Sequence, residues 1–234
     1  MIWALHGNLG SPDDWSAFTA VLGEEVVPPI LWEPKPEPFS AWARNFNDEV
    51  RRQDPKPIVI GYSLGGRLAM HAVTAPNAPW KAAIFVSAHP GLGDRGARAF
   101  RVDSDRQWTD LLRSGSKDAF LERWNAQATL QGEPVSGRQA EVVGRYSEAI
   151  AEAFHVWSLG NQKDLRSSLA DCHIPQLWVA GAEDRKFAGL MREAAAHVPS
   201  ASYAEIEASG HRVPLRNPSG LAECVRRFLA SLSL

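Results

Sequence analysis

The sequence has little that is typical of a secreted, membrane-bound or nucleic-acid-binding protein. It contains only two cysteines, Cys172 and Cys224, in no metal or disulfide spacing, so we expect free thiols in a reducing cytoplasm. The net charge of −2 at pH 7 offers no electrostatic attraction for nucleic acid or a membrane surface. We expect a cytoplasmic protein that binds neither and that is a monomer or a weak homo-oligomer.

Long apolar runs are also missing. No stretch approaches the roughly 18 apolar residues of a membrane span, and the opening MIWALHGNLG lacks the basic region of a signal peptide. The composition, 44% hydrophobic and 22% charged, is that of an ordinary globular protein. A length of 234 residues suits one α/β domain with an insertion.

Short apolar runs alternate with longer amphipathic segments, a pattern typical of a mostly parallel sheet flanked by helices. The helical periodicity predicts helices over 41–52, 64–74 and 221–232. The apolar runs predict six strands, over residues 2–5, 30–32, 58–61, 82–87, 176–180 and 202–206.

The alternation stops between about His89 and Ala170, where helical periodicity continues without a convincing strand. We interpret this segment as a helical cap inserted into the α/β core. The predicted organisation is therefore a first core part over 1–88, a cap over 89–170 and a second core part over 171–234.

The segment IVIGYSLGGRLAM combines a strand, a sharp turn and the start of a helix. Gly61 and Gly65 surround Ser63 in a G-x-S-x-G pattern, which is typical of a strained turn that projects a serine from the edge of a sheet. The motif alone is only moderately specific, because a serine in a helix-capping turn can match it.

A serine becomes reactive when a histidine accepts its proton and a carboxylate orients that histidine. Asp184 follows a predicted strand in LWVAGAEDRKF, and His211 follows the last one in ASGHRVPLRNP. Glu183 is the alternative acid. The order Ser63, Asp184, His211 predicts a catalytic triad, with oxyanion-hole amides from Leu64 and from Asn8 after the first strand.

The other histidines do not cluster as metal ligands do, and no glycine-rich phosphate loop follows a strand. We therefore expect no metal and no organic cofactor.

Together these motifs resemble the α/β-hydrolase superfamily, and within it the 2-succinyl-6-hydroxy-2,4-cyclohexadiene-1-carboxylate synthases of menaquinone and phylloquinone biosynthesis. The resemblance runs from Leu5 to about Pro218. It is carried by GYSLGGR, AHPGL, SDRQW, FLERWNAQ, DLR, GAEDRKF and GHRVPLRNP. AHPGL followed by SDRQW is more specific than the triad.

The resemblance implies a lyase rather than a hydrolase. Its substrate, a cyclohexene with a ring carboxylate, a succinyl arm and an enolpyruvyl ether, would lose pyruvate after a proton is removed next to the succinyl carbonyl. Ser63 would act as general base through His211 and Asp184. The amides of Leu64 and Asn8 would hold the developing oxyanion.

Such a substrate carries three carboxylates, and guanidinium groups bind carboxylates with a planar two-pronged fit. Arg67 lies in the helix that follows Ser63. The resemblance places further substrate-binding residues at Arg101 and Arg145 in the cap, with Arg98 as the alternative to Arg101. It also implies that Tyr62 and Trp124 shape the pocket.

Two departures from the family pattern concern the start of the chain. LWEPKPEPF stands where many relatives carry a glycine- and histidine-rich turn, and the antiparallel hairpin that opens many members is expected to be absent. Two other functions stay open: an esterase, thioesterase or carbon–carbon hydrolase with Ser63 as nucleophile, and a non-catalytic binding protein on the same fold.

Overall fold

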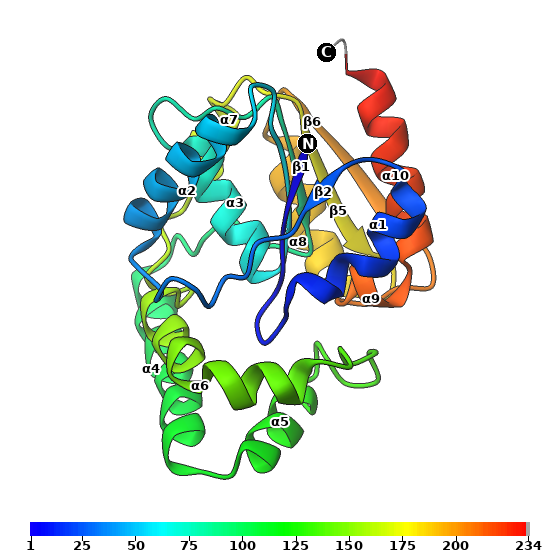
Figure 1. The fold of residues 1–234 in the computed structure, drawn as a ribbon. Coiled ribbons are helices and arrows are strands. Elements are labelled where there is room, and N and C mark those ends of the chain that lie inside the picture. Colours follow the sequence, from blue (N-terminus) through cyan, green and yellow to red (C-terminus); the bar gives the residue numbers. More distant parts are fainter. Residues whose placement is uncertain (233–234) are drawn as a thin grey trace.

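A six-stranded sheet forms the centre of the computed structural model, which describes residues 1–232 (Figure 1). Every strand pairs in parallel with its neighbours, in the order β2-β1-β3-β4-β5-β6. The strands are β1 (Ile2–Leu5), β2 (Val26–Val27), β3 (Ile58–Tyr62), β4 (Ala82–Val86), β5 (Gln176–Gly181) and β6 (Ala201–Ile206). The predicted α/β-hydrolase architecture with a mostly parallel sheet is confirmed.

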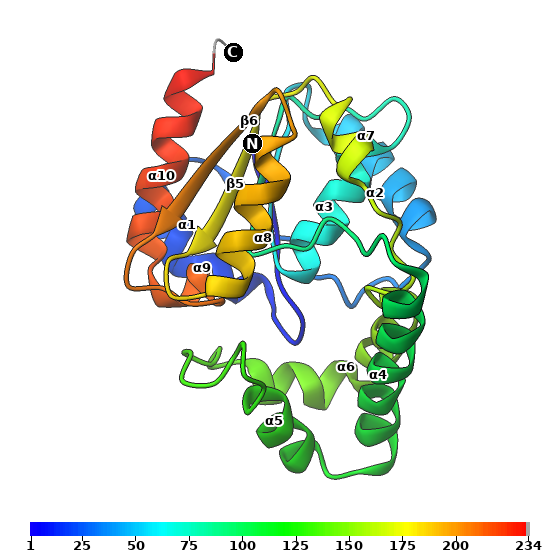
Figure 2. The same cartoon turned by 180° about the vertical axis from the view of Figure 1, so that it is seen from behind.

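Alternating side chains of the strands build one apolar layer on each face of the sheet. In β1, Ile2 and Ala4 pack in one cluster with Phe18, whereas Trp3 and Leu5 pack in the other with Phe46. The first face is covered by α1 (Ser16–Leu22) and α10 (Pro218–Ser231) (Figures 1 and 2). The second is covered by α2 (Phe39–Gln53), α3 (Leu64–Thr74) and α8 (Arg185–Ala196).

Between β4 and β5 the described chain is helical. The helices α4 (Arg95–Ser114), α5 (Lys117–Asn125) and α6 (Gln139–Val156) form a separate layer beyond the ends of the strands, and the short α7 (Arg166–Ala170) lies back against α3 (Figures 1 and 2). Aromatic side chains fill the centre of this layer, where the ring centroids of Trp108 and Trp124 are 5.1 Å apart. We call α4, α5, α6 and the loop 126–138 the cap.

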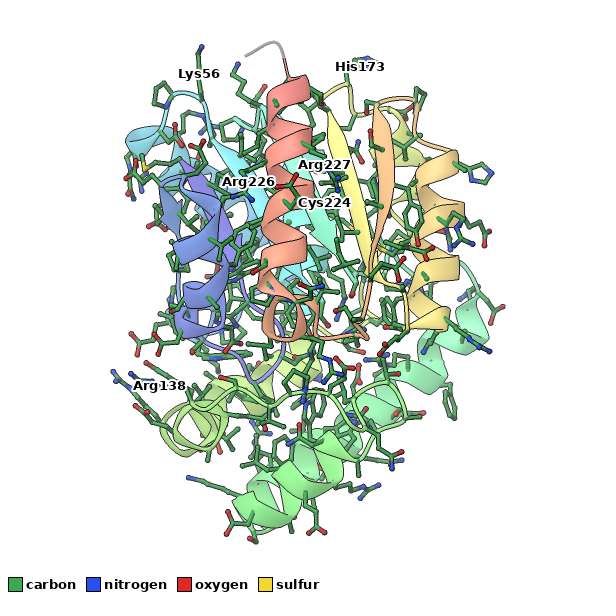
Figure 3. All side chains as sticks on the ribbon, turned by 90° about the vertical axis from the view of Figure 1, so that its right-hand side faces the viewer. Lys56, Arg138, His173, Cys224, Arg226 and Arg227 are labelled. Atoms are coloured by element: carbon green, nitrogen blue, oxygen red, sulfur yellow. The ribbon has the colours of Figure 1, made fainter. Side chains whose placement is uncertain are left out.

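The cap is tied to the core by polar contacts at its margins. Arg138, labelled in Figure 3 where the cap meets the core, lies 2.9 Å from the carboxylate of Asp13. The indole of Trp157 donates to the carbonyl of Glu37 at 2.7 Å. The division of the chain at residues 89 and 170 stays a prediction, and residues 233–234 of its last part lie outside the described residues.

Five of the six predicted strands are confirmed to within one residue at each end, but the strand at 30–32 is wrong. The second strand is β2, at Val26–Val27. Leu31 and Trp32 are buried against the loop after β1 instead: the Leu31 amide donates to His6 Nε2 at 3.1 Å, and the Trp32 indole donates to the Gly10 carbonyl at 2.8 Å. An apolar run in a sequence indicates that its residues are buried. It does not indicate whether they pair in a sheet or pack against a loop.

The short helices η1 (Pro12–Trp15) and α9 (Val213–Arg216) complete the described elements. Within residues 1–232, no helix has both the length and the apolar character that crossing a membrane requires.

Candidate active site

Ser63 occupies the sharp turn between β3 and α3. Its backbone angles, φ 52° and ψ −110°, lie in a strained region, as expected for a residue held by its surroundings at a functional turn. The flanking glycines make the turn possible. A Cβ on Gly61 would lie 2.3 Å from the Gly65 carbonyl oxygen, and one on Gly65 would lie 2.2 Å from the Leu5 carbonyl oxygen. No larger side chain fits at either position.

The tertiary structure brings Ser63, His211 and Asp184 into one hydrogen-bonded chain. Asp184 Oδ2 lies 2.8 Å from His211 Nδ1, and His211 Nε2 lies 3.3 Å from Ser63 Oγ. Asp184 Oδ1 accepts from the Phe187 amide at 3.1 Å, which fixes the carboxylate. With Nδ1 donating to Asp184, Nε2 is free to accept the serine proton. Asp184, not the neighbouring Glu183, is the acid in contact with His211.

The loop after β1 lies beside the serine turn. A Cβ on Gly7 would be 3.5 Å from Ser63 Cβ, and Asn8 and Ser63 line the same pocket. Within the described chain, neither the Asn8 amide nor the Leu64 amide donates to another backbone group. Both amides are therefore available to an oxygen bound near Ser63.

His6 holds this loop in place. Its ring is buried, Nε2 accepts from Leu31, and Nδ1 donates to the Gly7 carbonyl at 2.9 Å. Burial lowers the pKa of His6 to about 4, so the ring is neutral at pH 7. Because the C=O and N–H of a trans peptide point in opposite directions, holding the Gly7 carbonyl turns the Asn8 N–H away from His6.

The pocket at Ser63, of about 170 Å³, lies between the core and the cap. Tyr62 and His211 line it from the core, and Trp124 and Leu130 line it from the cap. Three basic side chains reach it, and no Asp or Glu is among the described residues that form its wall. The three are Arg101, Lys186 and Arg212.

Arg101 is the predicted cap arginine that the structure places at this pocket. Its side chain is 41% exposed, and Nε lies 2.8 and 2.9 Å from the two carboxylate oxygens of Asp105. Asp105 is itself buried and also accepts from Ser158 Oγ at 2.8 Å. Arg101 is thus anchored at Nε, and no protein acceptor in the described chain bonds its two terminal nitrogens.

Arg67 is not among the residues that line this pocket. Its guanidinium is buried, donating from Nε to Gln162 Oε1 and from Nη2 to the Trp157 carbonyl, both at 2.6 Å. Burial, and secondarily the charge of Arg101, lowers the pKa of Arg67 to about 9, which keeps it charged at pH 7. Arg67 therefore joins α3 to the segment that follows α6.

The structure does not bring the other two arginines to Ser63. Arg145 is exposed, lies 3.7 Å from the carboxylate of Glu33 and lines a separate pocket with Ile30. Arg98 donates from Nε to the Gly160 carbonyl at 2.9 Å and does not line the Ser63 pocket.

Sequence reasoning missed Lys186 and Arg212. Arg212 is buried and reaches the cap, with Nη1 donating to the Pro134 carbonyl at 3.1 Å and Nη2 to Asn125 Oδ1 at 2.5 Å. A usable signal existed, because Lys186 is two residues from Asp184 and Arg212 directly follows His211. Residues next to functional groups in loops at the carboxyl ends of parallel strands face the same crevice.

Within residues 1–232 there is no cluster of three or more His, Cys, Asp or Glu side chains that could hold a metal ion. Cys172 and Cys224 are free thiols. The expectation that no cofactor takes part stays a prediction.

Comparisons with known proteins agree with this architecture. Residues 4–224 match the alpha/beta hydrolase family. The 2-succinyl-6-hydroxy-2,4-cyclohexadiene-1-carboxylate synthase of Klebsiella pneumoniae subsp. pneumoniae is 31% identical over 176 residues, which are 74% of this chain and 68% of that protein. The synthase of the same name from Pectobacterium atrosepticum is 29% identical over 244 residues, 97% of this chain and 92% of that protein.

Two solved structures show the same fold. MenH from S. aureus superposes with a TM-score of 0.89 at 20% identity, covering 98% of this chain and 92% of that one. A thermophilic esterase from Thermogutta terrifontis superposes with a TM-score of 0.80 at 16% identity, covering 98% and 89%. The resemblance deduced from the sequence motifs is confirmed by the sequence relatives. The solved structures, at these identities, support the fold alone.

Proposed function

The chain belongs to the alpha/beta hydrolase family, and on this premise we propose that it is a lyase that eliminates pyruvate from 2-succinyl-5-enolpyruvyl-6-hydroxy-3-cyclohexene-1-carboxylate. The product is 2-succinyl-6-hydroxy-2,4-cyclohexadiene-1-carboxylate, the compound for which the synthase relatives are named.

The observation that carries the proposal is the charge of the pocket at Ser63. Arg101, Lys186 and Arg212 line it without a facing carboxylate among the described residues. Arg101 pairs with Asp105 through Nε alone, and its two terminal nitrogens keep no acceptor in the described chain. Cations in a confined space favour an anionic ligand, and guanidinium groups bind carboxylates with particular strength. A substrate with three carboxylates can form ion pairs with these basic side chains, whereas a neutral ester cannot.

In the proposed mechanism Ser63 is a general base. Its proton passes to His211 Nε2, and Asp184 stabilises the imidazolium that results. The serine oxygen then removes the proton next to the succinyl carbonyl. The electron pair of that C–H bond forms a double bond between ring carbons 2 and 3, and the existing double bond between carbons 3 and 4 moves to carbons 4 and 5. The C–O bond at carbon 5 then breaks, and the enolate of pyruvate leaves and takes up a proton.

The amides of Leu64 and Asn8 serve the same step by donating to the succinyl carbonyl oxygen as negative charge develops on it. Tyr62 and Trp124 bound the space around the ring. The amide donors are fixed before the substrate arrives, Leu64 by the start of α3 and Asn8 by the contacts of His6.

We assign the direct carboxylate contacts to Arg101, with Lys186 and Arg212 beside it. Arg67 adds only positive potential, because both of its short hydrogen bonds go to the protein. The cavity of about 170 Å³ is smaller than the roughly 300–1,000 Å³ of typical small-molecule sites. The pocket must therefore widen when the substrate binds, and Arg145 can join the site only if the cap also moves.

The decisive experiment supplies the succinyl-enolpyruvyl cyclohexene acid to the purified chain and follows pyruvate with a coupled dehydrogenase. The proposal expects turnover that needs no added metal and that Ser63→Ala abolishes. Hydrolysis of a p-nitrophenyl ester is measured in parallel, because the same triad would serve an esterase with Ser63 as nucleophile. Rapid ester hydrolysis without pyruvate release would replace the lyase by the esterase, and neither reaction would indicate a binding protein.

A further inference from the structure

A cavity larger than the one at Ser63 lies between the start of α2, the end of α3 and residues 155–168. Its volume, about 620 Å³, falls within the range of about 300–1,000 Å³ found for small-molecule sites. It shares no lining residue with the Ser63 pocket. Much of its wall is apolar, formed by residues such as Phe39, Ala43, Val156 and Leu165.

His71 lines this cavity and has no partner for its buried nitrogen. The residue is only 9% exposed, and Nε2 makes no hydrogen bond within the described chain. Its ring stacks on Phe39 with centroids 4.3 Å apart and planes 19° apart. Nε2 is itself covered by protein atoms, so His71 contributes to the cavity wall through the apolar part of its ring.

The cavity is also electropositive. Arg44, His155 and Lys163 belong to its wall, and no Asp or Glu is among the described residues that do. Neither Arg44 nor Lys163 forms an ion pair with another described residue, in contrast to Arg51 and Arg166 nearby. Burial, and then the charges of Arg67 and Lys163, lowers the pKa of His71 to about 3, so the ring itself stays neutral.

The first turn of α2 adds backbone donors to the same cavity. Pro38 precedes this 15-residue helix and supplies no capping side chain. The amides of Phe39 and Ser40 donate to no backbone acceptor in the described chain, and both residues line the cavity. Free amides at a helix start attract an anionic group.

We propose that this cavity is a second ligand site, which binds a small aromatic carboxylate. The ring system lies along the Phe39–His71 stack and the apolar wall, and the carboxylate faces the first turn of α2, Arg44 and Lys163. The site is independent of the reaction proposed at Ser63. The Phe39 ring in its wall lies 5.3 Å from the guanidinium of Arg67, which belongs to the helix that follows Ser63.

The test uses 2-naphthoate as the probe and isothermal titration calorimetry of the full chain at low salt. We expect one molecule bound per chain, and binding at least about tenfold weaker for neutral 2-naphthalenemethanol, which corresponds to losing one charge-assisted contact. Absence of heat for 2-naphthoate up to about 1 mM would overturn the proposal.

Variants locate the probe. The exposed pair Arg44→Ala and Lys163→Ala should together weaken 2-naphthoate at least about tenfold, and Ser40→Trp, at an exposed position of the wall, should block it. His71→Phe keeps the aromatic stack and should leave the affinity for the probe within about twofold. If thermal unfolding shows that Ser40→Trp does not fold, the double variant of Arg44 and Lys163 still tests whether 2-naphthoate binds in this cavity.

The matched controls are Arg101→Ala and Lys186→Ala in the Ser63 pocket, which should leave 2-naphthoate binding unchanged. Loss of binding in these controls, with retention in the Arg44/Lys163 double variant, would place the probe at Ser63 and refute the second site.

Discussion

The core side and the cap side of the Ser63 pocket are built differently. On the core side Ser63, His211 and Asp184 sit on turns whose backbone is crowded or buried, and each hydrogen bond is supported by another. On the cap side Arg101 is 41% exposed and anchored through Nε alone. Groups that react need fixed geometry, and the core side supplies more of it than the partly exposed Arg101 does on the cap side.

Arg67 does not line the pocket, so it belongs neither to its core side nor to its cap side. It carries the charge expected of a substrate ligand but has the burial and hydrogen bonds of a structural residue. Comparing variants of Arg67 and Arg101 tests which of the two arginines contacts the substrate. The predictions below are ordered by the size of the expected effect.

Ser63→Ala should produce the largest effect. We expect the rate of pyruvate release to fall by at least about 10³-fold, because no other group in the pocket is placed to pass a proton to His211. The free energy of unfolding should change little. The measurement is single-turnover pyruvate release, with the exposed Ser114→Ala as control. Retention of more than about a tenth of the rate would rule out Ser63 as the base.

Arg67→Ala should lower the free energy of unfolding by about 2–5 kcal/mol, because two buried acceptors lose their donor at about 1–3 kcal/mol each. The variant leaves Gln162 Oε1 and the Trp157 carbonyl without their donor. Urea unfolding measures the change, and Arg51→Ala on the exposed face of α2 is the control. An unchanged midpoint together with lost activity would instead make Arg67 a direct substrate ligand.

Acidification should destabilise the core side. The pKa of His6 is lowered from 6.5 to about 4 by burial, and those of His71 and His89 are lowered for the same leading reason. The unfolded chain therefore binds protons first as the pH falls below 6.5. The stability contributed by the neutral rings is complete above pH 6.5 and is lost as the pH falls toward 4.

For His6 alone this loss amounts to about 3 kcal/mol. Urea unfolding at a series of pH values between 7.5 and 4.5 tests it, with proton uptake measured on unfolding. A free energy of unfolding that stays level across this range would contradict the buried neutral state of these histidines.

Arg101→Ala should lower kcat/KM for the anionic substrate by about 10–100-fold, the loss of one charge-assisted contact of about 1.5–3 kcal/mol. The free energy of unfolding should fall as well, because the buried carboxylate of Asp105 loses its cationic partner, so kcat/KM is measured at a temperature where the variant is folded. Arg106→Ala is the matched control: it lies on the same helix, is exposed, pairs with Asp103 and does not line the pocket. Equal losses in both variants would mean that general helix charge, not a contact at Ser63, is responsible.

Arg145→Ala should have the smallest effect, less than about threefold in kcat/KM, because an exposed surface pair contributes little. Arg145 lines a different pocket in this arrangement. A loss as large as that of Arg101→Ala would show that the cap moves on substrate binding and brings Arg145 to the site.

Local signals were sufficient for much of the fold. The alternation of short apolar runs with amphipathic segments predicted five of the six strands and three of the five helices that cover them, α2, α3 and α10, because the periodicity of buried residues depends on near neighbours in the chain. The prediction of a strand at 30–32 was wrong because these apolar residues make a contact that is distant in the sequence. Leu31 and Trp32 are apolar because they pack on the loop of His6, a contact between segments about 25 residues apart.

The sequence by itself determined the fold class, the strained turn at Ser63 and the residue types of the triad, since each depends on neighbours in the chain or on chain order. Only the tertiary structure decided which acid contacts His211, which basic residues reach Ser63 and which do not. The sequence does not show whether an arginine is buried against Gln162, as Arg67 is, or extends into a pocket, as Arg101 does. Its role depends on the distances and burial that folding creates.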